Sequence, residues 1–117
     1  MYIDLSENKD MKLIEPKVLG ALGLARRAGK LVIGTEMCEE SVKNGSAQIT
    51  FIASNISQNS EKKIKSVLKN TDSPYMTLQT TKEELAAKLG KKAFAAAVSI
   101  TDKGFAEIIR KALGNQK

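Results

Sequence analysis

Histidine and tryptophan are absent from this 117-residue chain, which has a single cysteine, Cys38. One cysteine excludes an internal disulfide, and the lack of histidine removes the commonest zinc ligand and general base. Aromatic residues are also few, three Phe and two Tyr, which argues against a base-stacking surface of the kind that single-strand binders use. We therefore expect a protein that is not an enzyme, with no metal site and no cofactor.

Long apolar runs are missing as well. The run from Ala93 to Val98 is far too short to span a bilayer, and the N-terminus, with Asp4, Glu7 and Asp10, does not resemble a signal peptide. These features predict a cytoplasmic protein with no membrane partner. The length suits one domain, residues 12–117, and residues 1–11 lack helix or strand periodicity, so we expect them to form a flexible extension.

Basic residues outnumber acidic ones, with 19 Lys and Arg against 13 Asp and Glu and a net charge of +6. Such a balance favours polyanionic partners but also occurs in many other proteins. The lysine run from Lys62 to Lys69 fits a solvated helix face at least as well as a nucleic-acid contact. A phosphate loop is excluded at Gly23 to Lys30, because five residues separate the glycines and leucine follows the lysine.

Cap and stop residues divide the chain into alternating helices and strands. Residues 93–100 are ambiguous because their alanines favour helix, whereas Val98 and Ile100 favour a buried strand, which we adopt. The predicted strands are residues 31–33, 48–53, 75–78 and 93–100. The first predicted helix runs from Pro16 to Gly29, the second is capped by Thr35 and ends at Asn44-Gly45, and the third is capped by Ser57 or Asn59. The fourth opens with a Thr81 to Glu84 capping box and closes at Gly90, and the fifth is capped at Thr101-Asp102 and ended by Gly114. This alternation predicts a three-layer α/β/α sandwich around a mixed or mostly parallel four-stranded sheet.

Two exposed segments are candidates for binding. The helix after Gly34 presents backbone N–H groups that lack intrahelical acceptors, and such groups suit phosphates or base edges. The short basic loop Gly90 to Ala93 lies at one end of the predicted sheet. Glu36 and Glu40 share a helix face and allow a carboxylate site, although a solvated helix start explains them better, and Cys38 fits a small buried residue.

Four segments, 22–30, 34–45, 52–57 and 89–98, together resemble the kink-turn-binding ribosomal protein family called L-seven-Ae, and within it the small bacterial YlxQ-type members. The resemblance extends over about residues 16–114. It implies an α/β/α sandwich that binds RNA kink-turns, which are sharply bent helices containing tandem sheared G·A pairs. The helix at Gly34 would then enter the bent major groove, and the loop at Lys91-Lys92-Ala93 would cover an extruded nucleotide.

The chain departs from the pattern of archaeal and eukaryotic members, which typically carry Gly-x-Asn-Glu and then Lys three positions later. Its residues at those three polar positions are Glu36, Met37 and Glu40. Glu36 can accept hydrogen bonds from guanine, whereas Met37 cannot, and Glu40 places an anion near phosphate.

The resulting hypothesis is a monomeric, ribosome- or translation-associated protein that binds kink-turn-like structured RNA and not DNA. The alternative is a protein-interaction module of the same fold that has lost RNA binding through Met37 and Glu40. The residues predicted to form the RNA-binding site are Arg26, Arg27, Lys30, Gly34, Thr35, Glu36, Met37, Glu40, Lys91, Lys92 and Ala93. Arg26 and Arg27 are explained equally well as cations that favour the negative C-terminal end of their helix.

Overall fold

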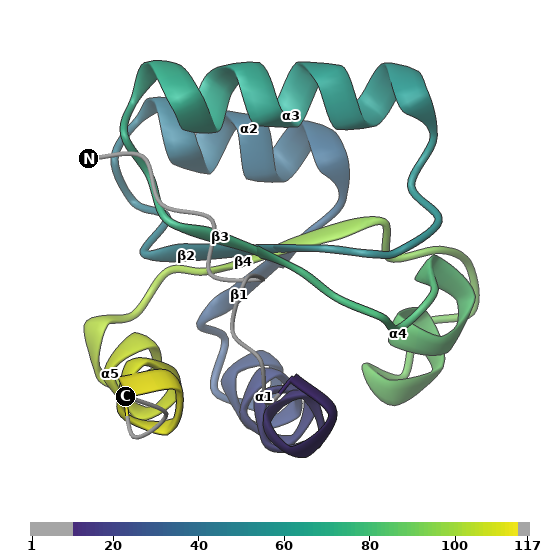
Figure 1. The fold of residues 1–117 in the computed structure, drawn as a ribbon, viewed down its shortest axis with the longest axis vertical. Helices are drawn as coiled ribbons and strands as arrows, with labels where there is room; N and C mark the ends of the chain where they lie inside the picture. Colours follow the sequence, from purple (N-terminus) through teal and green to yellow (C-terminus); the bar gives the residue numbers. More distant parts are fainter. Residues whose placement is uncertain (1–10, 115–117) are drawn as a thin grey trace.

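A four-stranded sheet lies between two layers of helices in the computed structural model, which describes residues 11–114 (Figure 1). The predicted three-layer α/β/α sandwich is confirmed. Along the chain the elements are α1 (Met11–Arg27), β1 (Leu31–Ile33), α2 (Thr35–Lys43), β2 (Ile49–Ile52), α3 (Gln58–Asn70), β3 (Tyr75–Thr77), α4 (Lys82–Lys88), β4 (Ala97–Ile100) and α5 (Lys103–Gly114).

The sheet is mixed, with strand order β1-β4-β2-β3. β4 pairs antiparallel with both β1 and β2, and β2 pairs parallel with β3. Of the two predicted alternatives, the mixed sheet is therefore correct. Among the described helices, none has the length and hydropathy needed to cross a bilayer.

Each face of the sheet carries its own apolar core, because alternate residues of a strand point to opposite faces. Ile49 and Phe51 of β2 pack with α1, α4 and α5, whereas Ile52 packs with α2 and α3 (Figure 1). The α2 side also buries two hydroxyls, Thr50 and Ser99, which hydrogen-bond to each other at 2.7 Å. The sheet thereby holds the helices of both layers at fixed positions relative to its ends.

Cys38 belongs to the core on the α2 side and has no exposed surface. Burial raises the pKa of its thiol to about 12. The side chain therefore stays a neutral thiol at ordinary pH, as expected for a small core residue.

Most helix ends follow the predicted cap chemistry. Ser57 caps α3 by accepting a hydrogen bond from the Ser60 N–H, and Thr81 and Glu84 form the capping box of α4. Gly29, at φ +72°, ends α1, where the Lys30 N–H donates to the Ala25 carbonyl at 2.8 Å. These ends depend on interactions within a few residues, which a sequence displays directly.

Several boundaries were predicted wrongly. β2 is one residue shorter at each end than the predicted strand 48–53, and β3 ends one residue before the predicted 78. α1 begins at Met11, not Pro16, because buried Ile14 and hydrogen-bonded Glu15 hold its early turns in place. Met11, which was predicted to belong to the flexible extension, is therefore helical. The rest of that extension, residues 1–10, lies outside the described residues. The cap of α2 is Gly34, not Thr35. β4 begins at Ala97, not at residue 93, because the Ala95 N–H donates to the Lys82 carbonyl instead of a neighbouring strand.

Candidate nucleic-acid interface

The N-terminal ends of α2, α3 and α4 meet the loop 91–96 at one end of the sheet, on the right of Figure 1. Two backbone hydrogen bonds fix this arrangement. The Gly34 N–H donates to the Ala97 carbonyl at 2.8 Å, and the Ala53 N–H donates to the Ala96 carbonyl at 2.9 Å. Two segments predicted as parts of one site, 34–37 and 91–93, are therefore at the same end of the molecule.

The first turn of α2 offers three backbone donors. Its first intrahelical hydrogen bond runs from the Cys38 N–H to the Gly34 carbonyl at 2.9 Å, so the N–H groups of Thr35, Glu36 and Met37 have no acceptor within the helix. In the described part of the chain, no side chain caps this helix start. Gly34 is not among these free donors, because the Ala97 carbonyl of β4 accepts from its N–H.

Gly34 contributes an open backbone surface at this turn rather than a hydrogen-bond donor. Its φ of +110° is one that residues with a side chain rarely adopt, and a Cβ built there meets nothing within 4 Å. The backbone is thus exposed on the outer side of the turn and open to close approach. Around it, Glu36 and Glu40 are exposed and Met37 is 51% exposed.

A cavity of about 290 Å³ adjoins the start of α2. Phe94 is 61% exposed beside it, and the Lys82 ammonium lies 4.7 Å from the centre of the Phe94 ring. An aromatic face next to a cation suits a base and its phosphate. The lining residues are Gly34, Thr35, Ser57, Ser60, Lys82, Phe94 and Ala96.

Lys82 and Phe94 were not predicted from the sequence as candidate site residues. The signal in the sequence was slight, one phenylalanine within an alanine-rich run directly after two lysines. Lys91, Lys92 and Ala93 are all exposed, as predicted for a basic loop.

Asn55 fixes the start of α4 at this end of the sheet. Its side-chain oxygen accepts from the Lys82 N–H at 2.7 Å, and its amide donates to Glu83 Oε1 at 2.9 Å. The latter bond is the main cause that lowers the pKa of Glu83 below its usual value. Asn55 thereby sets the position from which the Lys82 side chain reaches the cavity.

Glu15 holds the segment before α4 from the other side. Its carboxylate accepts from the Gln79 N–H at 2.9 and 3.0 Å, from the Thr80 N–H at 2.9 Å and from the Thr80 hydroxyl. With 7% of its surface exposed, Glu15 is a buried carboxylate satisfied by these donors. The sequence analysis missed it as well, because the contact joins residues more than sixty positions apart.

The remaining predicted residues lie elsewhere. Lys30 is at the opposite end of β1, roughly 13 Å from Gly34 by strand rise, where its carbonyl accepts from the Thr101 N–H. Arg26 and Arg27 lie in the layer of α1 and α4, on the other face of the sheet from α2 (Figure 1). A Cβ built on Gly90 would come within 3.7 Å of the Arg26 guanidinium, so Arg26 adjoins the base of the lysine loop.

Acidic residues do not gather into a metal site in the part of the chain that the structure describes: no group of three or more His, Cys, Asp or Glu side chains is suitably placed. Glu36 is exposed in the first turn of α2, where the helix dipole favours a carboxylate, and Glu40 is exposed one turn later. The first turn of α2 and the cavity beside it offer free amides, the Phe94 ring and one cation, Lys82.

Comparison with known proteins places this architecture in a family. Residues 16–110 match the model of the "Ribosomal protein L7Ae/L30e/S12e/Gadd45 family". The chain is 36% identical to the RNA-binding protein YlxQ of Enterococcus faecium, over 78% of this chain and 85% of that protein. It is 32% identical to the large ribosomal subunit protein eL30 of Methanosarcina mazei, over 73% of this chain and 79% of that protein.

A solved structure supports the same fold. The Giardia lamblia 15.5kD RNA binding protein superposes with a TM-score of 0.73, covering 93% of this chain and 89% of that one at 15% identity. Sequence and fold thus agree on one assignment, which confirms the resemblance read from the four segments. The chain belongs to the ribosomal protein L7Ae/L30e/S12e/Gadd45 family, as a member similar to YlxQ.

Proposed function

We propose that this protein binds structured RNA, that it recognises the sharply bent backbone of a kink-turn, and that it works in association with the ribosome. One observation carries the proposal. Three backbone donors at the start of α2 lie at the same end of the sheet as the Lys91-Lys92 loop and the cavity beside Phe94. The printed names of the relatives, an RNA-binding protein and a large-subunit ribosomal protein, agree with it.

Each part of this surface has a role that its chemistry suits. The N–H groups of Thr35, Glu36 and Met37 donate to phosphates or base edges, and the Glu36 carboxylate accepts from guanine. An extruded nucleotide enters the cavity, where its base lies against Phe94 and its phosphate near Lys82. A bend is needed, because the major groove of regular A-form RNA is too narrow for a helix to read.

The proposal predicts selective binding of bent RNA. In a gel shift at fixed salt, a kink-turn hairpin should bind roughly 10- to 100-fold more tightly than the same hairpin with its G·A pairs changed to Watson–Crick pairs, as expected for the loss of one specific base contact. Equal binding, or no binding to either hairpin, would contradict kink-turn recognition. It would favour the alternative, a protein-interaction module of the same fold.

The lysine loop has its own test. Replacing both Lys91 and Lys92 by alanine should weaken binding of the kink-turn hairpin and flatten its log-log dependence on salt by about 0.7–0.9 for each lost phosphate contact. The matched control replaces Lys103 and Lys111, two exposed lysines of α5, and should leave the slope almost unchanged. A filter-binding titration measures both. An unaltered slope in the loop variant would remove the loop from the interface.

A further inference from the structure

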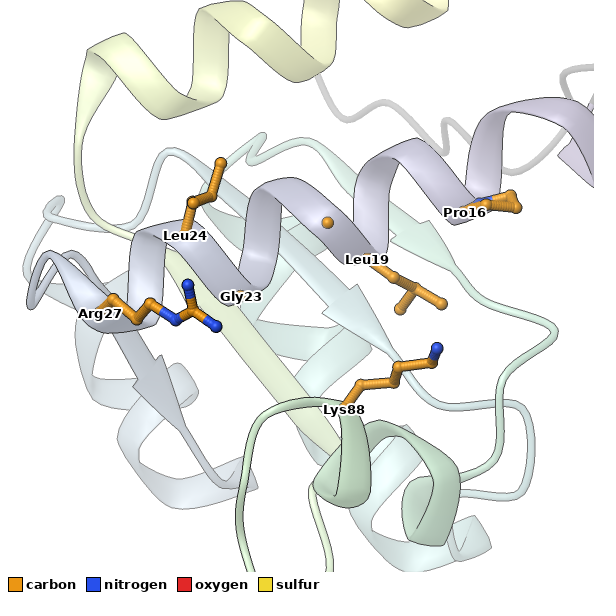
Figure 2. A pocket seen from close by; sticks show the side chains of 7 residues that line it. Pro16, Leu19, Gly23, Leu24, Arg27 and Lys88 are labelled. Carbon is orange, nitrogen blue, oxygen red and sulfur yellow. The ribbon is translucent and has the colours of Figure 1, made fainter.

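A groove runs along α1 on its side facing α4 (Figure 2). It comprises two neighbouring hollows of about 430 and 290 Å³, which share three lining residues, Gly23, Arg27 and Lys88. The other lining residues that matter for its chemistry are Leu19, Gly20, Leu24 and Arg26.

The floor of the groove is apolar and accessible. A Cβ built on Gly20 or Gly23 meets nothing within 4 Å, so the α1 backbone is bare there. Leu24 is 56% exposed at one side, and Leu19 is half-buried. From Pro16 to Arg27 the helix rises roughly 17 Å, which is the length of about three turns of a second helix lying alongside.

The charged groups of the groove all have one sign. Arg26, Arg27 and Lys88 are exposed, and no carboxylate is among the lining residues. Within residues 11–114, no salt bridge joins any of these three cations to a carboxylate. The groove thus combines an apolar floor with positive charge that its own surroundings leave uncompensated.

We propose that this groove docks an acidic amphipathic helix of a partner protein. The apolar side chains of such a helix would cover Leu19 and Leu24 over the bare glycines, and its carboxylates would face Arg27 and Lys88. The exposed Leu24, with half-buried Leu19 near it, favours a protein over RNA as the occupant. Most of the groove lies on the opposite face of the sheet from α2 (Figure 1), and only its end at Arg26 and Gly90 comes near the Lys91-Lys92 loop.

Two synthetic 14-residue peptides test this docking. Both carry leucines along one helical face; one has glutamates beside that face and the other has lysines. Fluorescence anisotropy with the full chain should show the acidic peptide binding at least about tenfold more tightly than the lysine peptide. The double variant Arg27→Glu, Lys88→Glu should remove that preference, because it reverses the two charges that the glutamates face. Equal binding of the two peptides to the unaltered protein would overturn the proposal.

Two further variants separate the groove from general effects. Lys62→Glu with Lys63→Glu changes the net charge equally on α3, in the other layer, and should leave the preference for the acidic peptide intact. A Cβ added at Gly20 meets nothing within 4 Å, and leucine improves helix propensity. Gly20→Leu should therefore fold, place a side chain in the groove and lose peptide binding about tenfold. Circular dichroism confirms the fold, and unchanged peptide binding by this variant would contradict the proposal.

The same Gly20→Leu variant decides between occupants. Its affinity for the kink-turn hairpin should match that of the unaltered protein, and its mass by light scattering should not change. If the variant loses affinity for the hairpin, the groove binds RNA. If the unaltered protein is a dimer and the variant is not, the groove binds a second copy of the chain. Either result overturns the proposal. Because the hairpin and the peptides are measured separately, failure of peptide docking leaves the RNA proposal standing.

Discussion

Replacing Glu15 by alanine is expected to lower the free energy of unfolding by about 1–3 kcal/mol, because partly buried donors lose the acceptor that satisfies them. The donors are two backbone N–H groups and the Thr80 hydroxyl, and Glu15 is 7% exposed. Urea denaturation followed by circular dichroism measures the effect. Glu15→Gln keeps one acceptor oxygen and should lose about half as much stability.

The control for this prediction is Glu107→Ala, which removes an exposed carboxylate from α5 and should change stability by less than about 0.5 kcal/mol. A Glu15→Ala variant as stable as that control would show that the carboxylate does not hold the segment. Its contact also positions Thr81, the cap of α4, and through it Lys82 at the cavity. Weaker binding of kink-turn RNA should therefore accompany the loss of stability.

Local chemistry explains which parts of the fold the sequence revealed. Ser57, Thr81 and Gly29 act on backbone groups within a few residues of themselves, so the helix ends that they set could be read from the chain. Strand order is different. The central place of β4 between β1 and β2 depends on pairings between residues 45 to 69 positions apart, and no local pattern records them.

The same pairing explains the error at the start of α2. Thr35 has the side chain of a good N-cap, but β4 draws the Gly34 N–H to the Ala97 carbonyl, and the turn is completed at Gly34 with a φ that favours glycine. The cap position is thus set by the sheet and not by the hydroxyl. Thr35 is left with its own N–H free, which is the feature that the proposed interface uses.

The candidate site also has parts that depend on local sequence and parts that depend on contacts between distant residues. Its two continuous segments, 34–37 and 91–93, could be predicted because a helix start and a basic loop are local features. Lys82 and Asn55 could not, since Asn55 comes to the start of α4 from 27 residues earlier in the chain. Phe94 became a candidate site residue only because the structure places the Lys82 ammonium beside its ring. The site residues that could not be predicted from the sequence are therefore those whose place depends on contacts with residues distant in the chain.

Replacing Glu40 by lysine is expected to tighten binding of kink-turn RNA roughly tenfold at 0.1 M salt and to steepen the log-log salt slope by about 0.7–0.9, the amount for one added phosphate contact. Glu40 is exposed on α2, one turn after Glu36, at the position where the resemblance implies lysine in archaeal and eukaryotic members. The change removes a repulsion from phosphate and adds an attraction. A cation also suits this position in the last turns of α2, so the helix should not lose stability.

A matched variant separates contact from net charge. Glu107→Lys makes the same change of charge on α5, in the other layer of the sandwich, and should alter affinity for the hairpin by less than about twofold, since exposed charges beyond a Debye length of about 8–10 Å are largely screened. Filter binding at several salt concentrations measures both variants. If Glu40→Lys and Glu107→Lys raise affinity equally, α2 does not lie against the phosphates. If only Glu40→Lys does, the carboxylate at this position limits affinity in the unaltered protein.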